Sequence, residues 1–363
     1  MTKKILSLFF AVSLYGYSAA RPAHRAVHPQ VSQELQEIFS NVVDIIEPAL
    51  VNISNIQADE DAPFYFFFRG PLEDLLNREP IPNGDKQEST ASGFVISTDG
   101  YILTNYHVIR GADELAVALH NGETYDAEIV GTDPYTDLAV IKINPPEDLE
   151  ILEMGDSDEI QVGNWVVAAG SPFGLNNTYT TGIISGTRQN IQVEDMSYQD
   201  LLQTDAAINR GNSGGPLVNL MGEAIGVNTA IFAPTGVFTG IGFAIPINQA
   251  KAILEEMIQT GQVSRGWLGI EILDVDPETK AAYTVDTESG AVISGILGNS
   301  PAEEAGLQIG DVVVEIDGMT ITTAAELQEA VADNKPGTEV SMLVIRNSEE
   351  LRLSARLGER VNQ

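Results

Sequence analysis

Short predicted strands follow one another from Gly93 to Pro246, and this pattern restricts the fold more than any other feature of the chain. Turn dipeptides such as Asp99-Gly100 and Asn121-Gly122 separate strands in which apolar residues alternate with polar ones. Helical periodicity is scarce across the same span. Regularly spaced short strands with few helices indicate a β-barrel or a β-sandwich.

The segments that flank these strands have a different periodicity. Apolar residues recur at helical spacing after Ser32, which predicts a helix that ends before Pro48. A strand is expected over Ala49–Ile56, and a second helix over Asn248–Thr260, with Gly261 as its cap. We therefore expect helices at both ends of the β-rich region.

Residues 57–90 fit neither pattern. They combine acidic residues, four prolines and an uninterrupted aromatic run from Phe64 to Phe68. A long irregular connection inside a domain is usually functional or disordered, and disordered segments contain few aromatic residues. We therefore predict a functional loop here.

The C-terminal part of the chain mixes strands and helices. The expected strands are Leu268–Leu273, Ala291–Ile296, Asp311–Ile316 and Glu339–Ile345, and the expected helices lie near Ala302 and over Ala324–Ala332. With 363 residues, the chain is long enough for two domains. We predict a mainly β domain over residues 32–262 and an α+β domain over 263–358, with short tails at 21–31 and 359–363.

The N-terminal residues have the features of an export signal. Lys3 and Lys4 precede an apolar run over Ile5–Leu14, and small residues lead up to Ala20. The apolar run is shorter than the about 20 residues that a membrane span needs. We expect cleavage after Ala20, so that residues 1–20 are a signal peptide. The alternative is an uncleaved anchor in the inner membrane.

The charge of the chain excludes some partners. It carries 52 acidic and 19 basic residues, a net charge of −33, whereas nucleic acids and anionic lipids are bound by clustered Lys and Arg. We therefore expect no nucleic-acid partner. Cysteine is absent, which excludes disulfides, Cys-based zinc sites and a Cys nucleophile. We expect no metal ion and no cofactor.

The strongest chemical signal is the motif Gly211-Asn212-Ser213-Gly214-Gly215. A serine hydroxyl is a weak nucleophile that needs an adjacent base and donors for the developing oxyanion. Glycines on both sides of Ser213 allow a tight turn that aims backbone N–H groups at one point. We assign the oxyanion hole to Gly211 and Ser213, with Asn212 contributing its amide. The alternative is a Gly-Ser turn without chemistry.

The same motif matches the nucleophile elbow of α/β-hydrolases, in which the catalytic histidine follows the serine. All four histidines of this chain precede Ser213, which excludes that fold: they are His24, His28, His107 and His120. His107 is the candidate base, because it follows the apolar strand Tyr101–Leu103 at a point where a side chain can leave the sheet edge. His120 adjoins a turn dipeptide and is expected to be exposed.

A serine–histidine pair also needs a carboxylate that orients the imidazole. Asp133 and Asp137 both precede the apolar strand Leu138–Ile143. Asp133 is followed by proline, which is typical of an Asp that begins a turn. Asp137 directly adjoins the apolar run, so we predict that its carboxylate is the buried, catalytic one.

Four motifs resemble the HtrA/Deg family of proteases: Thr104–Val108, Asp137–Ile143, Thr204–Asn219 and Gly242–Pro246. The resemblance covers nearly all of residues 32–358. It implies a chymotrypsin/trypsin-like double β-barrel protease domain followed by an α+β PDZ domain. It further implies an ATP-independent serine endopeptidase of the periplasm, assembled as homotrimers or larger homo-oligomers, that degrades unfolded or misfolded proteins. The segment 57–90 would then be the regulatory loop of the family.

The resemblance also suggests specificity and regulatory residues. Trypsin-like enzymes that cleave after basic residues carry an Asp six positions before the nucleophile, where this chain has Ala207. The implied S1 pocket is lined by Ile208, Phe232 and Ile241, which favours small or medium aliphatic residues. The alternative is that these three are core residues. Arg188 is the candidate for the basic residue that senses activation, on a loop before Tyr198.

The C-terminal motifs Asn299–Leu307, Ile309–Asp311 and Ile316–Gly318 resemble a bacterial PDZ domain. Such domains add a peptide as a strand to a sheet edge and hold its carboxylate in a backbone nest. The expected nest is Trp267, Leu268, Gly269 and Ile270, facing a helix around Leu327 and Val331. The expected partners are C-terminal peptides; the alternative is an α+β packing domain.

Three functions stay open at this stage. The first is an endopeptidase of protein quality control that uses Ser213, His107 and Asp137. The second is a chaperone or scaffold that holds misfolded chains without cutting them. The third is a signalling protease with a narrow target that becomes active when its PDZ domain binds a peptide. Because all three triad residue types are present, the purely binding function is the weakest of the three.

Overall fold

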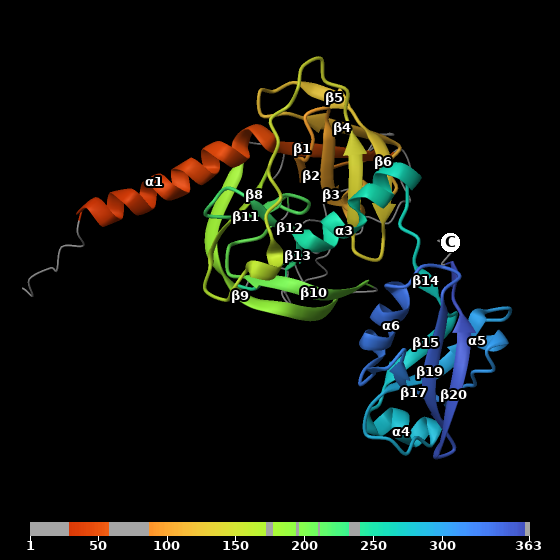
Figure 1. Ribbon diagram of the computed structural model, residues 1–363. Coiled ribbons are helices and arrows are strands. Elements are labelled where there is room, and N and C mark those ends of the chain that lie inside the picture. The colour runs from red at the N-terminus through yellow and green to blue at the C-terminus, as the bar shows by residue number, and fades with distance from the viewer. Residues whose placement is uncertain are drawn as a thin grey trace, which may run out of the picture.

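The computed structural model describes residues 29–57, 87–171, 177–193, 196–209, 211–231 and 240–359. Two β-rich halves pack against each other, and a smaller α+β unit follows them at the C-terminal end (Figure 1). The predicted order of a mainly β region followed by an α+β region is confirmed.

The first half is a seven-stranded antiparallel sheet in the order β5-β4-β1-β2-β3-β7-β6. Its strands are β1 (Leu50–Gln57), β2 (Gln87–Val95), β3 (Tyr101–Asn105), β4 (Glu114–Ala118), β5 (Thr124–Asp126), β6 (Glu128–Asp133) and β7 (Leu138–Lys142). Gly100 and Gly122 adopt φ values of 101° and 87°, so both predicted turn dipeptides do reverse the chain. Strand β7 is almost wholly buried, as its continuous apolar sequence predicts.

The second half is a closed six-stranded barrel in the order β10-β13-β12-β11-β8-β9. Its strands are β8 (Trp165–Gly170), β9 (Thr178–Val193), β10 (Met196–Thr204), β11 (Pro216–Asn219), β12 (Ala224–Ile231) and β13 (Gly242–Pro246). One apolar core runs through the sheet and part of the barrel, where side chains such as Phe94, Val167 and Ile245 are buried. The two halves therefore share a core, and residues at their junction are fixed from both sides.

Helices flank this β region as predicted. Helix α1 (Pro29–Ile46) extends outward from the body and ends where a 3-10 turn, Glu47–Ala49, contains Pro48 (Figure 1). Helix α3 (Ile247–Thr260) follows β13 and ends at Gly261, which adopts a φ of 82°. No helix within the described ranges is long and apolar enough to cross a membrane.

The C-terminal unit has its own apolar core. Its main sheet has the order β15-β16-β17-β19-β20, with β18 paired to β17, and β14 pairs separately with β21. The strands are β14 (Gly266–Trp267), β15 (Ile270–Asp274), β16 (Ala291–Ile296), β17 (Val312–Ile316), β18 (Met319–Thr320), β19 (Glu339–Arg346), β20 (Glu349–Arg356) and β21 (Gly358–Glu359). The helices are α4 (Pro277–Tyr283), α5 (Pro301–Glu304) and α6 (Ala324–Ala332).

Several predicted bounds change in the structure. The strand predicted to start at Leu268 starts at Ile270, because Gly269 has a φ of 75° and turns the chain first. The irregular segment predicted for 57–90 is shorter at both ends: Gln57 closes β1, and residues 87–90 belong to β2. The rest of that segment, the predicted signal peptide and residues 360–363 of the predicted tail lie outside the described residues.

Candidate active site

Ser213 lies in a tight loop between β10 and β11, at the junction of the two halves. The glycines on both sides of Asn212-Ser213 have left-handed backbones, with φ values of 95° at Gly211 and 81° at Gly214. In this conformation the Ser213 hydroxyl donates to the carbonyl oxygen of Thr229 across 3.4 Å. The glycine-flanked turn expected from the motif is present.

His107 is placed by the end of strand β3. The sequence predicted a strand ending at Leu103 with the histidine at its edge, but β3 continues to Asn105 and His107 lies in a one-turn helix, α2 (Tyr106–Ile109). The Nδ2 group of Asn105 donates to the backbone oxygen of Asp137 across 3.0 Å. The chain therefore enters α2 at Asn105, a residue that is hydrogen-bonded to Asp137 in the turn before β7.

Asp137 is fully buried and holds His107 by two contacts. Its Oδ2 atom lies 2.7 Å from Nδ1 of His107, and its Oδ1 atom accepts the His107 backbone N–H across 2.9 Å. Asp137 has a φ of 58°, a left-handed conformation that Asp tolerates better than most residues. The burial predicted for this carboxylate from its position before β7 is confirmed.

Two residues that the sequence did not suggest bind the same carboxylate. The Tyr198 hydroxyl donates to Oδ2 of Asp137 across 3.0 Å, and the Thr229 hydroxyl does so across 2.9 Å. Burial, together with the charge of Asp137, raises the pKa of Tyr198 far above that of a free tyrosine, so its hydroxyl stays a proton donor. Oδ2 thus faces three donors, which stabilise its negative charge.

Thr229 also connects the carboxylate to Ser213. Its hydroxyl binds Asp137, while its carbonyl oxygen accepts the Ser213 hydroxyl. The structure therefore brings Ser213, Asp137 and His107 into one hydrogen-bonded cluster. Tyr198 and Thr229 come from barrel strands remote in sequence, and no local motif marks them.

Asp133, the alternative acid, forms contacts that stabilise the local structure. Its carboxylate accepts the N–H of Tyr135 across 3.2 Å and the hydroxyl of Thr136 across 2.8 Å, as expected of an Asp that begins a turn. It also pairs with Arg265 across 2.6 Å, a contact that the sequence did not indicate. Asp133 thus shapes the turn that ends at Asp137.

The three predicted oxyanion residues differ in their environments. Among the described residues, no acceptor binds the backbone N–H of Gly211 or Ser213. The N–H of Asn212 donates to the Asn209 carbonyl across 3.0 Å, and its buried side chain donates to the Ala207 carbonyl across 3.4 Å. In this conformation the Asn212 amides are therefore bound within the protein.

The predicted S1 residues are only partly described. Ile208 is buried in the apolar cluster of the barrel, and a side chain on Gly242 would contact it. Ile241 is partly buried and packs on the shared core, while Phe232 lies outside the described residues. Ile208 thus lies next to Gly242, the residue that follows Ile241, and its surroundings are those of a core residue.

The predicted carboxylate nest lies beside a free sheet edge. Among the described strands, β15 pairs only with β16, and α6 packs close to it. Between β14 and β15, Leu268 is buried, and no described residue accepts the N–H of Leu268 or Gly269. The exposed edge of β15 and the adjacent turn therefore form one continuous surface with α6.

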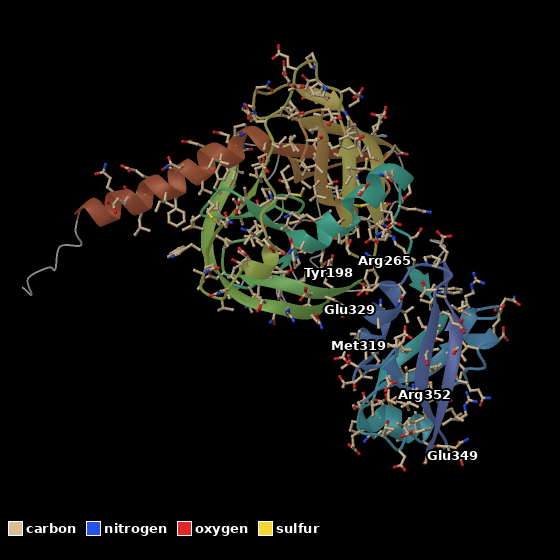
Figure 2. The ribbon with its side chains drawn as sticks, in the orientation of Figure 1. Tyr198, Arg265, Met319, Glu329, Glu349 and Arg352 are labelled. Atoms are coloured by element: carbon tan, nitrogen blue, oxygen red, sulfur yellow. The ribbon has the colours of Figure 1, made fainter. Side chains whose placement is uncertain are left out.

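Arg188 lies within β9 with a φ of 56°, and not on a loop as the sequence suggested. Burial raises the pKa of Asp200, in the paired strand β10, and the charge of Arg188 opposes this shift. Next to Asp200, the Gln199 side chain donates to the Ala325 carbonyl of α6 across 3.5 Å. In Figure 2, Tyr198, Arg265 and Glu329 lie at this junction between the barrel and the C-terminal unit.

Comparison with known families gives two matches in chain order. A trypsin-like peptidase domain matches residues 91–227, and a PDZ domain matches residues 266–357. These matches confirm the predicted fold class of a trypsin-like domain followed by a PDZ domain.

Relatives match over most of the chain. A "Probable periplasmic serine endoprotease DegP-like" of Hahella chejuensis is 41% identical over 330 residues, which are 88% of this chain and 70% of the relative. A protein of the same name from Chlamydia trachomatis serovar D is 38% identical over 389 residues, covering 97% and 78%.

Solved structures of HtrA-type proteases also match most of the chain. The HtrA-type protease AlgW with a decapeptide superposes with a TM-score of 0.75 at 38% identity, covering 90% of this chain and 99% of that one. The serine endoprotease from Yersinia pestis gives a TM-score of 0.66 at 32% identity, covering 89% and 98%.

Proposed function

Because this chain belongs to the HtrA/DegP-like family of serine endoproteases, we propose that Ser213 is its nucleophile, His107 its general base and Asp137 the orienting carboxylate. The contact that carries this proposal is the 2.7 Å approach of Asp137 Oδ2 to His107 Nδ1. It directs the other ring nitrogen, Nε2, toward proton transfer with the nucleophile. Thr229 supports the assignment because it contacts both Ser213 and Asp137.

Hydrolysis then proceeds in two steps. The Ser213 hydroxyl exchanges its acceptor, the Thr229 carbonyl, for Nε2 of His107 and attacks the peptide carbonyl carbon. His107 takes the hydroxyl proton and returns it to the leaving amine as the C–N bond breaks. Water, deprotonated by the same imidazole, attacks the acyl-enzyme and releases the acid and Ser213.

The oxyanion of each tetrahedral intermediate is bound by the backbone N–H groups of Gly211 and Ser213. Support comes from the described residues, none of which accepts either of these two protons. Losing one such donor typically costs about 3 kcal/mol of transition-state stabilisation. Asn212 contributes less, because its amide groups are bound to protein carbonyls in this conformation.

The S1 pocket is proposed to lie at Ile208, Phe232 and Ile241 and to accept small or medium aliphatic side chains. Its support is the apolar character of these residues and Ala207 at the position where a basic-specific enzyme carries Asp. Peptide substrates with Val, Ala or Leu before the scissile bond should be cleaved faster than matched peptides with Lys.

The substrates are proposed to be unfolded or misfolded proteins of the periplasm. The relatives are named as periplasmic proteins, and the N-terminal residues of this chain have the composition of an export signal. Mass measurement of the mature chain would test removal of residues 1–20.

The PDZ domain is proposed to bind C-terminal peptides along β15, with the carboxylate held at Trp267–Ile270. The free edge of β15 supports this, as does the bend at Gly269, where an added Cβ would lie 2.4 Å from the Ser300 Cβ atom. A peptide whose C terminus is amidated should bind more weakly than the free acid, as measured by calorimetry.

Self-assembly is proposed to involve α1, whose outer face exposes apolar side chains. Leu35, Ile38 and Ile45 are 44%, 38% and 46% exposed, and Trp165 beside the helix is 48% exposed. Light scattering on a Leu35→Ser, Ile38→Ser variant would test whether this face holds a homotrimer or a larger oligomer together.

The triad is tested by single substitutions assayed on casein. Ser213→Ala should abolish cleavage, and Asp137→Asn should lower kcat by about 10⁴-fold because it leaves the wrong imidazole tautomer. Asp133→Asn is the matched control, because it neutralises an acid of the same turn that does not contact His107. It unpairs Arg265 and lowers stability, but kcat per folded molecule should stay close to that of the wild type. Full activity of Ser213→Ala would overturn the proposal. A holdase assay on that variant separates a chaperone activity from proteolysis.

A further inference from the structure

Ser92 connects the first sheet to the loop that carries Ser213. It lies in β2, is fully buried, and forms hydrogen bonds through its hydroxyl, its N–H and its carbonyl. Of its four hydrogen bonds to residues outside β2 described below, three join it to the second half of the domain, at Ser171, Gly211 and Ser213. Among the described residues of the first sheet, no other residue forms hydrogen bonds with both Gly211 and Ser213.

The Ser92 hydroxyl has a defined proton position. Its Oγ atom accepts the backbone N–H of Ser171 across 2.7 Å, and it lies 2.5 Å from the carbonyl oxygen of Gly211. A carbonyl oxygen can only accept, so the hydroxyl proton points at Gly211. The hydroxyl thus links two loops of the barrel that are separate in sequence.

The backbone of Ser92 holds a second point of the loop. Its N–H donates to the carbonyl oxygen of Ser213 across 3.0 Å, while its own carbonyl accepts the Thr104 hydroxyl across 2.8 Å. Ser92 therefore binds two carbonyl groups of the loop: that of Gly211, which precedes Asn212, and that of Ser213 itself. Both peptide planes that bracket the dipeptide Asn212-Ser213 are attached to the first sheet.

The opposite ends of these planes are also bound. The N–H of Asn212 donates to the Asn209 carbonyl, and the N–H of Gly214 donates to the Asn228 carbonyl across 2.8 Å. With both planes fixed, the Cα atoms of Asn212 and Ser213 are held in place, which restricts rotation of the peptide between them that carries the Ser213 N–H. Gly211 has a φ of 95° and no side chain, so its carbonyl depends on Ser92 for its orientation.

We propose that Ser92 is a positioning residue for peptide hydrolysis: its hydroxyl, by holding the Gly211 carbonyl, sets the loop geometry that aligns the nucleophile and the oxyanion donors. This inference rests on the proposed role of Ser213. Ser92 does not touch substrate; it acts through the Gly211–Asn212 peptide. A displacement of about 1 Å in such a group can cost about 100-fold in rate.

The test is Ser92→Ala in the full chain, assayed with a fluorogenic peptide that has an aliphatic residue before the scissile bond. We expect kcat to fall by about 10- to 100-fold with KM changed by less than about twofold, because the loss affects alignment and not substrate binding. The rate of Ser213 sulfonylation by phenylmethylsulfonyl fluoride should fall with kcat. Ser92→Thr, which keeps the hydroxyl, should recover more activity than Ser92→Cys, which offers only a weak donor.

Ser157→Ala is the matched control. Ser157 is also buried, and its hydroxyl accepts the N–H of Asn248 across 3.2 Å, away from the nucleophile loop. Its loss should lower stability and leave kcat and the sulfonylation rate unchanged. Rates for every variant are expressed per folded molecule, with the folded fraction taken from circular dichroism. If Ser92→Ala does not fold, the kcat and sulfonylation rate of Ser92→Cys are compared with those of the wild type at a temperature where Ser92→Cys is folded.

The inference would be overturned if folded Ser92→Ala had the kcat and sulfonylation rate of the wild type. It would also be overturned if Ser92→Thr were no more active than Ser92→Cys. Failure of the proposed function looks different. In that case Ser213→Ala keeps its activity, or mass spectrometry of the wild-type chain finds the sulfonyl group on a residue other than Ser213.

Discussion

The hydroxyl of Tyr198 donates to Oδ2 of Asp137 across 3.0 Å, from a strand that also contacts the PDZ domain. The next residue, Gln199, donates to the Ala325 carbonyl of α6, the helix that borders the proposed peptide groove. Only one peptide bond therefore separates a contact with the proposed catalytic carboxylate from a contact with the PDZ domain.

The Tyr198–Asp137 bond is expected to support catalysis. Tyr198→Phe keeps the buried ring and removes one of three donors to Oδ2, which weakens stabilisation of the imidazolium. Hydrogen bonds to charged groups contribute about 1.5–3 kcal/mol, so kcat should fall by roughly 10- to 100-fold with little change in KM. Tyr179→Phe is the control, because among the described residues the Tyr179 hydroxyl has one hydrogen-bond partner, the Asn177 side chain, which donates to it across 3.4 Å. Equal kcat values for the two variants would contradict the prediction.

Gly214 is expected to tolerate no side chain. A Cβ atom there would lie 2.2 Å from the Ser92 carbonyl and the Thr104 hydroxyl, in addition to the cost of a φ of 81°. Gly122 has a similar φ of 87° with no atom within 4 Å of an added Cβ. Gly122→Ala should therefore cost only about 1–2 kcal/mol and leave kcat unchanged. Gly214→Ala should cost more stability and lower kcat at least about 100-fold. Urea unfolding and peptide hydrolysis check both.

Arg265 and Asp133 form an ion pair between the start of the PDZ domain and the turn that ends at Asp137. Their side chains are 12% and 3% exposed, and Arg265 also lies 4.5 Å from the ring centre of Tyr135. Arg265→Met leaves the Asp133 carboxylate buried and unpaired, so unfolding should become easier by about 3–5 kcal/mol.

The control for this pair is Arg352–Glu315, in which Arg352 is 63% exposed (Figure 2). Arg352→Met should change the free energy of unfolding by no more than about 1 kcal/mol. A double-mutant cycle over Arg265→Met and Asp133→Asn measures the coupling of the buried pair. A coupling energy near zero would show that the two side chains do not stabilise each other.

The Glu256–Lys335 pair predicts a pH dependence of stability. Burial alone would raise the pKa of Glu256, but hydrogen bonds from Lys335 and from the Ser264 N–H outweigh it and lower the pKa. The folded state thus favours the carboxylate, and this stabilisation is present above the ordinary pKa of 4.5 and is lost as the pH falls through the lowered value.

Glu256→Gln should therefore destabilise the chain at neutral pH by no more than about 1 kcal/mol, since Lys335 is largely exposed. The difference between variant and wild type should shrink as the solution is acidified below about pH 4. Thermal unfolding at both pH values checks this. A difference that grows on acidification would reverse the assigned sign.

Several features of the fold and the site follow from the sequence alone. Local steric rules place Gly100, Gly122 and Gly261 where the chain turns, and continuous apolar residues bury β7. The order of His107 before Ser213 excludes the α/β-hydrolase fold without any coordinates. The burial of Asp137 was predictable because the residue directly adjoins that buried strand.

Only the tertiary structure decided what surrounds these residues. Tyr198 and Thr229 lie 61 and 92 positions from Asp137, Ser92 lies 119 from Gly211, and Arg265 lies 132 from Asp133. Sequence patterns report contacts within a few residues, because helix and strand periodicities are local. Contacts between the two halves depend on how the sheet and the barrel pack, which no local period encodes. The sequence by itself therefore indicated which residues are candidates for the chemistry, and the packing of the two halves determined which residues hold them in place.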